Sequence, residues 1–86
     1  MKKIEEKTWK YILKTEKVLK DLRVLEDSIS IDKRLVEEIV DKARRYFEDA
    51  KYYFRRKEYE VSLTSIAYCE GLLDALRILN LVDFEW

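Results

Sequence analysis

Apolar residues recur every three or four positions through most of the chain, and one long stretch in its last third carries few charges. The stretch from Val61 to Val82 holds only three charged residues, Glu70, Asp74 and Arg77, in a chain that is 42% charged. Such an uncharged stretch has to be covered either by the rest of the protein or by another molecule. We interpret it as the last helix of an all-α bundle.

The first helix is predicted from about Lys2 to Leu25. Its apolar and small residues alternate in spacing between four and three, which is the seam of a helix that packs along its length. That seam consists of Ile4, Thr8, Tyr11, Thr15, Val18, Leu22, Leu25 and Ile29.

The pattern breaks at residues 28–32, where Ser and Asp are typical helix N-caps. We expect Asp32 to cap the second helix, with Ser30 as the alternative. This second helix is predicted from Lys33 to Arg55, and the short link makes it antiparallel to the first. Its apolar arc alternates large and small residues: Val36, Ile39, Val40, Ala43, Tyr46, Phe47, Ala50, Tyr53 and Phe54.

The turn after Arg55 lacks the Gly that usually occupies the left-handed position behind a helix. We predict that Lys57 takes this position. The third helix then runs from about Glu58 to Asn80, because Asn is the second choice for a left-handed residue at a helix end.

The third helix carries two adjacent apolar rows. One is Val61, Ser65, Tyr68, Leu72, Ala75 and Leu79, and the other is Ser62, Ile66, Cys69, Leu73 and Leu76. Three small residues spaced by four, Ala67, Gly71 and Ala75, form a smooth strip. Gly inside a helix costs about 1 kcal/mol relative to Ala, so the strip should serve a close contact, either with the aromatic side chains of the second helix or with a partner.

The tail after Asn80 alternates apolar and charged residues and ends with Phe84 and Trp86. Exposed aromatic side chains of this size reduce solubility. We therefore expect both to dock, on the bundle or on a partner.

The predicted fold is all-α: one domain, residues 1–86, folded as an antiparallel up-down-up three-helix bundle with a tight hairpin of the second and third helices. The absence of Pro and the single Gly favour helices over strands and long loops. A domain this small buries only roughly 60 to 65% of its unfolded surface, so the core is thin.

The amino-acid composition indicates the type of organism and the cellular location of the protein. The chain lacks His and Gln and is rich in Lys, Glu and Arg, which is typical of hyperthermophile proteins. A single Cys and the lack of a basic start followed by an apolar run argue against export, so we expect a cytoplasmic protein. No stretch reaches the roughly 18 to 20 consecutive apolar residues of a membrane span.

Two segments carry a family resemblance. They are Tyr46-Phe-Glu-Asp-Ala-Lys-Tyr-Tyr-Phe54 and Ile66-Ala-Tyr-Cys-Glu-Gly-Leu-Leu-Asp-Ala75, with Tyr59 between them. Together they resemble the archaeal family of domain of unknown function 357. Its most specific part is a motif of unknown role that includes Tyr68, Glu70, Gly71 and Asp74. The resemblance implies a small cytoplasmic helical bundle and no particular activity.

Catalytic chemistry has few candidates here. Without His, neither a Ser/His nor a Cys/His pair can form, and Cys69 lies on an apolar row where a free Cys is usually buried. Glu70 and Asp74 lie one turn apart and are most simply solvated or structural acids, with a shared divalent cation as the less favoured alternative. We therefore predict no enzyme, no catalytic residue, no metal site and no cofactor.

Charge is segregated although it sums to zero. Basic residues gather at the start of the first helix and in the second turn, which an up-down-up bundle places at the same end. This predicted basic patch consists of Lys3, Lys7, Lys10, Lys14, Arg55, Arg56 and Lys57. It would suit a nucleic-acid backbone or a phosphate ligand, although an ordinary solvated surface laced with salt bridges is the simpler explanation.

Two functional hypotheses follow. The first is a non-enzymatic interaction or assembly module, either a homodimer or a subunit of another assembly, that docks through the third helix and the tail. Its partner-binding residues would be Ala67, Gly71, Ala75, Phe84 and Trp86. The alternative is binding of nucleic acid or a phosphate ligand by the basic patch. Neither hypothesis involves a membrane.

Overall fold

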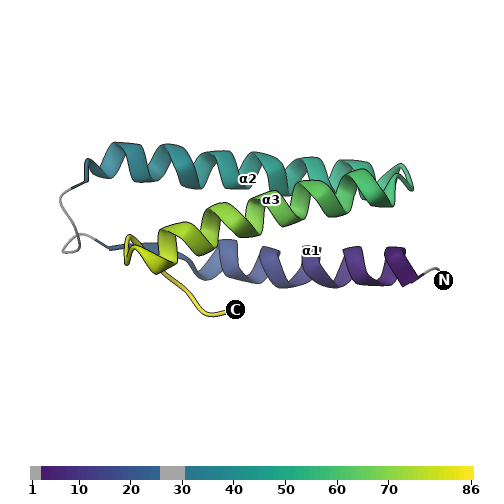
Figure 1. The fold of residues 1–86 in the computed structure, drawn as a ribbon, viewed down its shortest axis with the longest axis horizontal. Helices are drawn as coiled ribbons and strands as arrows, with labels where there is room; N and C mark the ends of the chain where they lie inside the picture. Colours follow the sequence, from purple (N-terminus) through teal and green to yellow (C-terminus); the bar gives the residue numbers. More distant parts are fainter. Residues whose placement is uncertain (1–2, 26–30) are drawn as a thin grey trace.

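The computed structural model describes residues 3–25 and 31–86 and shows three long helices. These are α1 (Lys3–Asp21), α2 (Lys33–Arg55) and α3 (Tyr59–Ile78), with two short strands, β1 (Arg23–Val24) and β2 (Val82–Asp83). Helices α2 and α3 form an antiparallel hairpin, and α1 lies along it (Figure 1). The predicted all-α, up-down-up three-helix bundle is confirmed.

The core is built from the apolar residues that the helical spacing places on one side of each helix. Side chains from α1, α2, α3 and the tail meet there. The buried apolar residues are Ile12, Val18, Leu19, Val36, Val40, Ala43, Phe47, Ala50, Ile66, Cys69, Leu73, Leu76, Leu81, Val82 and Phe84. The small residues of α2 let α3 approach closely enough for the buried Ser62 hydroxyl to donate to the Ala50 carbonyl oxygen at 2.6 Å.

Local chemistry sets the start of α2 and the C-terminal ends of α2 and α3 where the sequence predicts them. The Asp32 carboxylate accepts from the Arg34 backbone amide at 2.9 Å, so Asp32 is the N-cap of α2. Lys57 and Asn80 both have positive φ, 63° and 59°. The residue after each donates back five positions, Glu58 to the Tyr53 carbonyl and Leu81 to the Leu76 carbonyl, both at 2.9 Å. Both left-handed positions are therefore confirmed.

Three details of the predicted first helix and its link lie outside the described residues: Lys2 as the first helical residue, Ile29 as the last seam residue and Ser30 as the alternative cap.

The predicted end of the first helix at Leu25 is wrong, because α1 ends at Asp21. Residues 23–24 instead pair antiparallel with residues 82–83, and the Leu25 amide donates to the Leu81 carbonyl oxygen at 2.9 Å. An ion pair joins the side chains of Arg23 and Asp83. The spacing of Leu22 and Leu25 suits a helix, but the tail supplies backbone partners that no local pattern shows.

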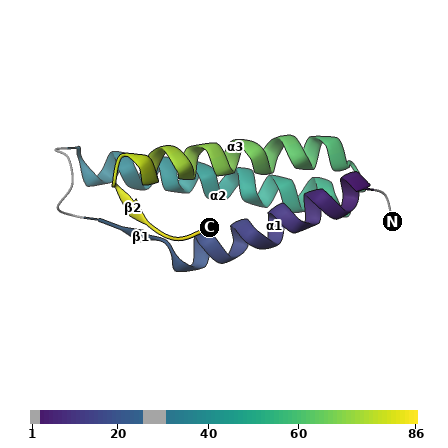
Figure 2. The same ribbon diagram turned by 60° about the horizontal axis from the view of Figure 1, so that its bottom comes forward.

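The tail docks on its own bundle, which is one of the two outcomes that the sequence left open. Phe84 is only 6% exposed and its ring lies edge-on to Trp86, with the ring centroids 5.0 Å apart. The Trp86 indole donates to the Asp74 carboxylate at 2.6 Å, and the Lys14 ammonium lies 5.0 Å from the Trp86 ring centroid. Figure 2 shows the tail running from β2 back toward α1.

Candidate functional site

Each polar residue of the α3 motif contacts another part of the chain. The Glu70 carboxylate faces α1, where it pairs with the Lys14 ammonium at 3.3 Å and accepts from the Thr15 hydroxyl at 3.5 Å. The Asp74 carboxylate, one turn later, accepts from Trp86 of the tail. The two acids therefore join α3 to α1 and to the tail, which is a structural role.

Tyr68, on the other flank of α3, faces α2 instead. Its ring stacks on Tyr46 with the centroids 4.3 Å apart, yet it stays 47% exposed. The motif thus combines contacts to α1, α2 and the tail within two turns of α3.

Cys69 is fully buried between these contacts. Burial, and next the negative charge of Glu70, raise the pKa of its thiol to about 12, against a smaller opposing effect of Arg44. The thiol is protonated at neutral pH, so Cys69 packs as a small apolar side chain and is a poor nucleophile.

The small strip of Ala67, Gly71 and Ala75 lies open on the outer side of α3. All three residues are exposed, and a Cβ on Gly71 would meet no atom within 4 Å. Of the two close contacts that the sequence left open for this strip, the one with the aromatic side chains of α2 is therefore wrong. The strip lies away from the buried row of α3, and Tyr46 of α2 stacks on Tyr68 instead.

A broader apolar surface runs beside the strip, along the junction of α2 and α3. We call it the α2/α3 face. Its α2 row is Leu35, Ile39, Lys42, Tyr46, Asp49 and Tyr53, and its α3 row is Val61, Ser65, Tyr68, Leu72, Ala75 and Leu79. Five large side chains of the face are between 37% and 48% exposed: Leu35, Ile39, Val61, Tyr68 and Leu79.

Contacts on both flanks show that the two rows belong to one surface. The Tyr46–Tyr68 stack joins them directly. The opposite flanks of α2 and α3 face α1, because the Arg44 guanidinium donates to the Leu19 carbonyl oxygen at 3.3 Å and Glu70 pairs with Lys14. Around Tyr46 and Tyr68 the α2/α3 face is therefore the side of the hairpin turned away from α1, whereas Val61 at one end of the face shares a hollow with Ile4 of α1.

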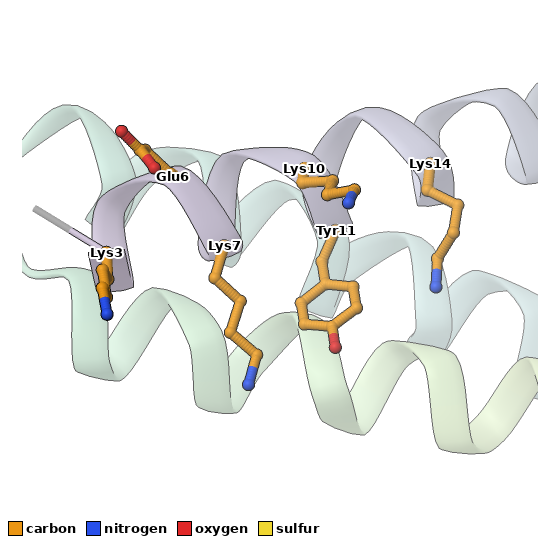
Figure 3. A pocket seen from close by; sticks show the side chains of 6 residues that line it. All are labelled: Lys3, Glu6, Lys7, Lys10, Tyr11 and Lys14. Atoms are coloured by element: carbon orange, nitrogen blue, oxygen red, sulfur yellow. The ribbon is translucent and has the colours of Figure 1, made fainter. Parts of the chain in front are cut away.

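The predicted lysine line on α1 borders a surface groove of about 510 Å³. Four side chains in it, Lys3, Lys7, Tyr11 and Lys14, extend to the same side of α1, as Figure 3 shows. Lys10 and Glu6 complete the lining. Lys14 is already engaged with Glu70, Tyr11 and Trp86.

The basic turn does lie near the start of α1, as predicted, but it carries acids as well. Lys57 and Ile4 line one hollow of about 370 Å³ together with Glu58 and Glu60. Arg56 donates to Glu58 at 2.7 Å, and this hydrogen bond is the main reason that the pKa of Arg56 is raised. Arg55 is exposed. The basic character is therefore strongest along α1 and weaker at the turn.

Among residues 3–25 and 31–86, no group of three or more His, Cys, Asp or Glu could hold a metal ion. None of the helices in this part of the chain is both long enough and apolar enough to cross a membrane.

The fold and its contacts define a small hairpin bundle whose α3 motif fastens the first helix and the tail. The family model described as protein of unknown function (DUF357) matches residues 10–82, and the chain belongs to this family. That match spans α2, α3 and most of α1, and so extends beyond the two segments that first carried the resemblance. Neither the curated proteins nor the solved structures include a match to the sequence.

Sequence reasoning placed the motif on the third helix but missed the α2/α3 face as one surface. The α3 row could be recognised in the sequence as uncharged residues at helical spacing. Its α2 counterpart was hidden, because Ile39, Tyr46 and Tyr53 were counted with the core and Lys42 and Asp49 interrupt the row.

Proposed function

We propose that the protein is a non-enzymatic interaction or assembly module that docks through the α2/α3 face. The observation that carries this proposal is the α3 row, Val61 to Leu79, which runs uncharged for five turns and is exposed or half-buried along its length. Continuous apolar surface of this kind marks protein interaction sites.

The docking surface differs from the one expected from the sequence. Phe84 is buried in the core of its own chain, and Trp86 contacts Asp74 and Phe84. The tail therefore packs on the bundle and stabilises it. Helix α3 keeps its docking role, with α2 in place of the tail as the second half of the surface.

A pair of adjacent substitutions tests the proposal. Tyr68→Lys places a charge in the centre of the face, whereas Ala67→Lys places the same charge on the small strip, and both positions are exposed. The tagged full chain serves as bait for an untagged copy and for an extract of its host, followed by mass spectrometry.

We expect wild type and Ala67→Lys to retain the same polypeptides and Tyr68→Lys to lose them. Equal retention by Tyr68→Lys would refute docking through the face. Loss with Ala67→Lys alone would place the docking surface on the small strip, and no retention by wild type would refute the proposal as a whole.

The second candidate is nucleic-acid or phosphate-ligand binding. The groove that carries Lys3, Lys7, Lys10 and Lys14 beside the Tyr11 ring favours it, because lysines neutralise phosphates and aromatic rings stack on bases. Fluorescence anisotropy with labelled single-stranded RNA and DNA tests it. Affinity should fall with salt and in Lys7→Glu, but much less in Lys20→Glu, which changes an exposed lysine outside the groove. Absent or salt-insensitive binding would refute this candidate.

A further inference from the structure

We infer that the occupant of the α2/α3 face is a second copy of this chain, bound through a two-fold axis beside Tyr46 and Tyr68. The inference rests on the proposed docking function and specifies its partner. The two hairpins would then pack face to face as a four-helix bundle of two layers, with α2 antiparallel to α2 of the partner subunit and α3 antiparallel to its copy.

Charge complementarity within the face is the main argument. Lys42 and Asp49 are the charged members of its two rows, they are exposed, and they lie seven residues apart on α2. Neither has an ion-pair partner among the described residues. An axis midway between them puts Lys42 opposite the partner subunit's Asp49, and the symmetry repeats this pair. The face is thus complementary to itself, as a two-fold interface requires.

The same axis gives a consistent register on α3. The midpoint of Lys42 and Asp49 falls beside Tyr46, and Tyr46 is tied to Tyr68 by the ring stack. An axis at Tyr68 places Val61 opposite the partner subunit's Ala75, and Ser65 opposite the partner subunit's Leu72. On both sides of the axis a larger side chain therefore opposes a smaller one, which favours close helix packing, and at the axis Tyr68 meets its own copy.

The size of the face also suits a dimer. Helices of 23 and 20 residues are roughly 30 Å or more long, and two of them side by side are roughly 20 Å wide, which gives on the order of 600 Å² in projection. The accessible surface of a ridged helical face exceeds its projection. It therefore approaches the roughly 800 Å² per partner of a standard stable interface.

Charge reversal tests the register. Lys42→Asp alone places two carboxylates opposite each other on both sides of the axis, and Asp49→Lys alone places two ammonium groups there. An equimolar mixture of the two variants restores both attractive pairs in the heterodimer. Lys17→Asp makes the same change of charge at an exposed position of α1 and serves as the control.

Sedimentation equilibrium of the full chain, from micromolar to millimolar concentration, gives the readout, and circular dichroism checks that each variant is folded. We expect a wild-type dimer, a dissociation constant weakened roughly tenfold or more in each single reversal, and recovery in the mixture. The control should behave as wild type.

A monomer throughout the concentration range would overturn the inference, and so would a dimer that ignores both reversals. The proposed function is tested separately. If the chain is monomeric but Tyr68→Lys still abolishes retention of a different protein, the self-association fails and the docking function stands. If Tyr68→Lys changes nothing either, both fail.

Discussion

Replacing Phe84 by Ala should remove much of the stability of this small domain. Phe84 is 6% exposed, lies against Trp86 and under the Arg77 guanidinium, and belongs to the core cluster although it is two residues from the C terminus. Truncation of a buried Phe to Ala costs about 3 to 5 kcal/mol. We expect about 3 kcal/mol here, because a site near the chain end relaxes more easily than one within a helix.

This loss is large relative to the total free energy of unfolding of the domain. At about 0.05 to 0.15 kcal/mol per residue, 86 residues give a free energy of unfolding of roughly 4 to 13 kcal/mol. A loss of about 3 kcal/mol corresponds to a fall in Tm of roughly 12 to 24 °C.

Urea unfolding followed by circular dichroism measures the change. Ile78→Ala is the control, since Ile78 is 79% exposed and its truncation should change the free energy of unfolding by less than about 0.5 kcal/mol. A Phe84→Ala loss as small as that of the control would refute the docked tail, and with it the β1–β2 pairing that precedes Phe84.

Three further predictions follow from single contacts. Lys57→Gly should be neutral or stabilising by up to about 1 kcal/mol, because Gly adopts the φ of 63° without strain; a clear fall in Tm would contradict this. Ser62→Ala should cost about 1 kcal/mol in urea unfolding, because the buried hydroxyl donates to the Ala50 carbonyl oxygen, whereas Thr64→Ala, at an exposed position, should cost less. The raised pKa of Cys69 makes the unfolded chain lose its thiol proton first, so stability is fully present below the ordinary pKa of 9.0 and falls between there and about 12. The fall should be steeper than in Cys69→Ala by up to about 1.4 kcal/mol per pH unit; equal slopes in the two proteins would show that the thiol ionises in the folded state.

Much of the fold follows from local rules. The Asp32 cap depends on one carboxylate and the amides beside it, and the left-handed Lys57 and Asn80 depend on where helical periodicity stops. These features involve groups within five residues of one another, so the sequence displays them directly.

The candidate site was only partly predictable. The motif acids stood one turn apart on a helix in the sequence, but their partners Lys14 and Trp86 are distant along the chain. The same holds for the end of α1. Residues 22–25 continue a helical spacing, and only the arrival of residues 81–83 replaces that helix by a strand pair.

Three amphipathic helices, their turns and the family motif on the third helix could be predicted from the amino-acid sequence, because periodicity and capping act over a few residues. Which side of α3 is covered depends on how the whole chain packs. Helix α1 and the tail bury one flank through Glu70 and Asp74, while the row from Val61 to Leu79 stays open beside α2. Both flanks are apolar enough to be buried, and one additional helix can cover only one of them.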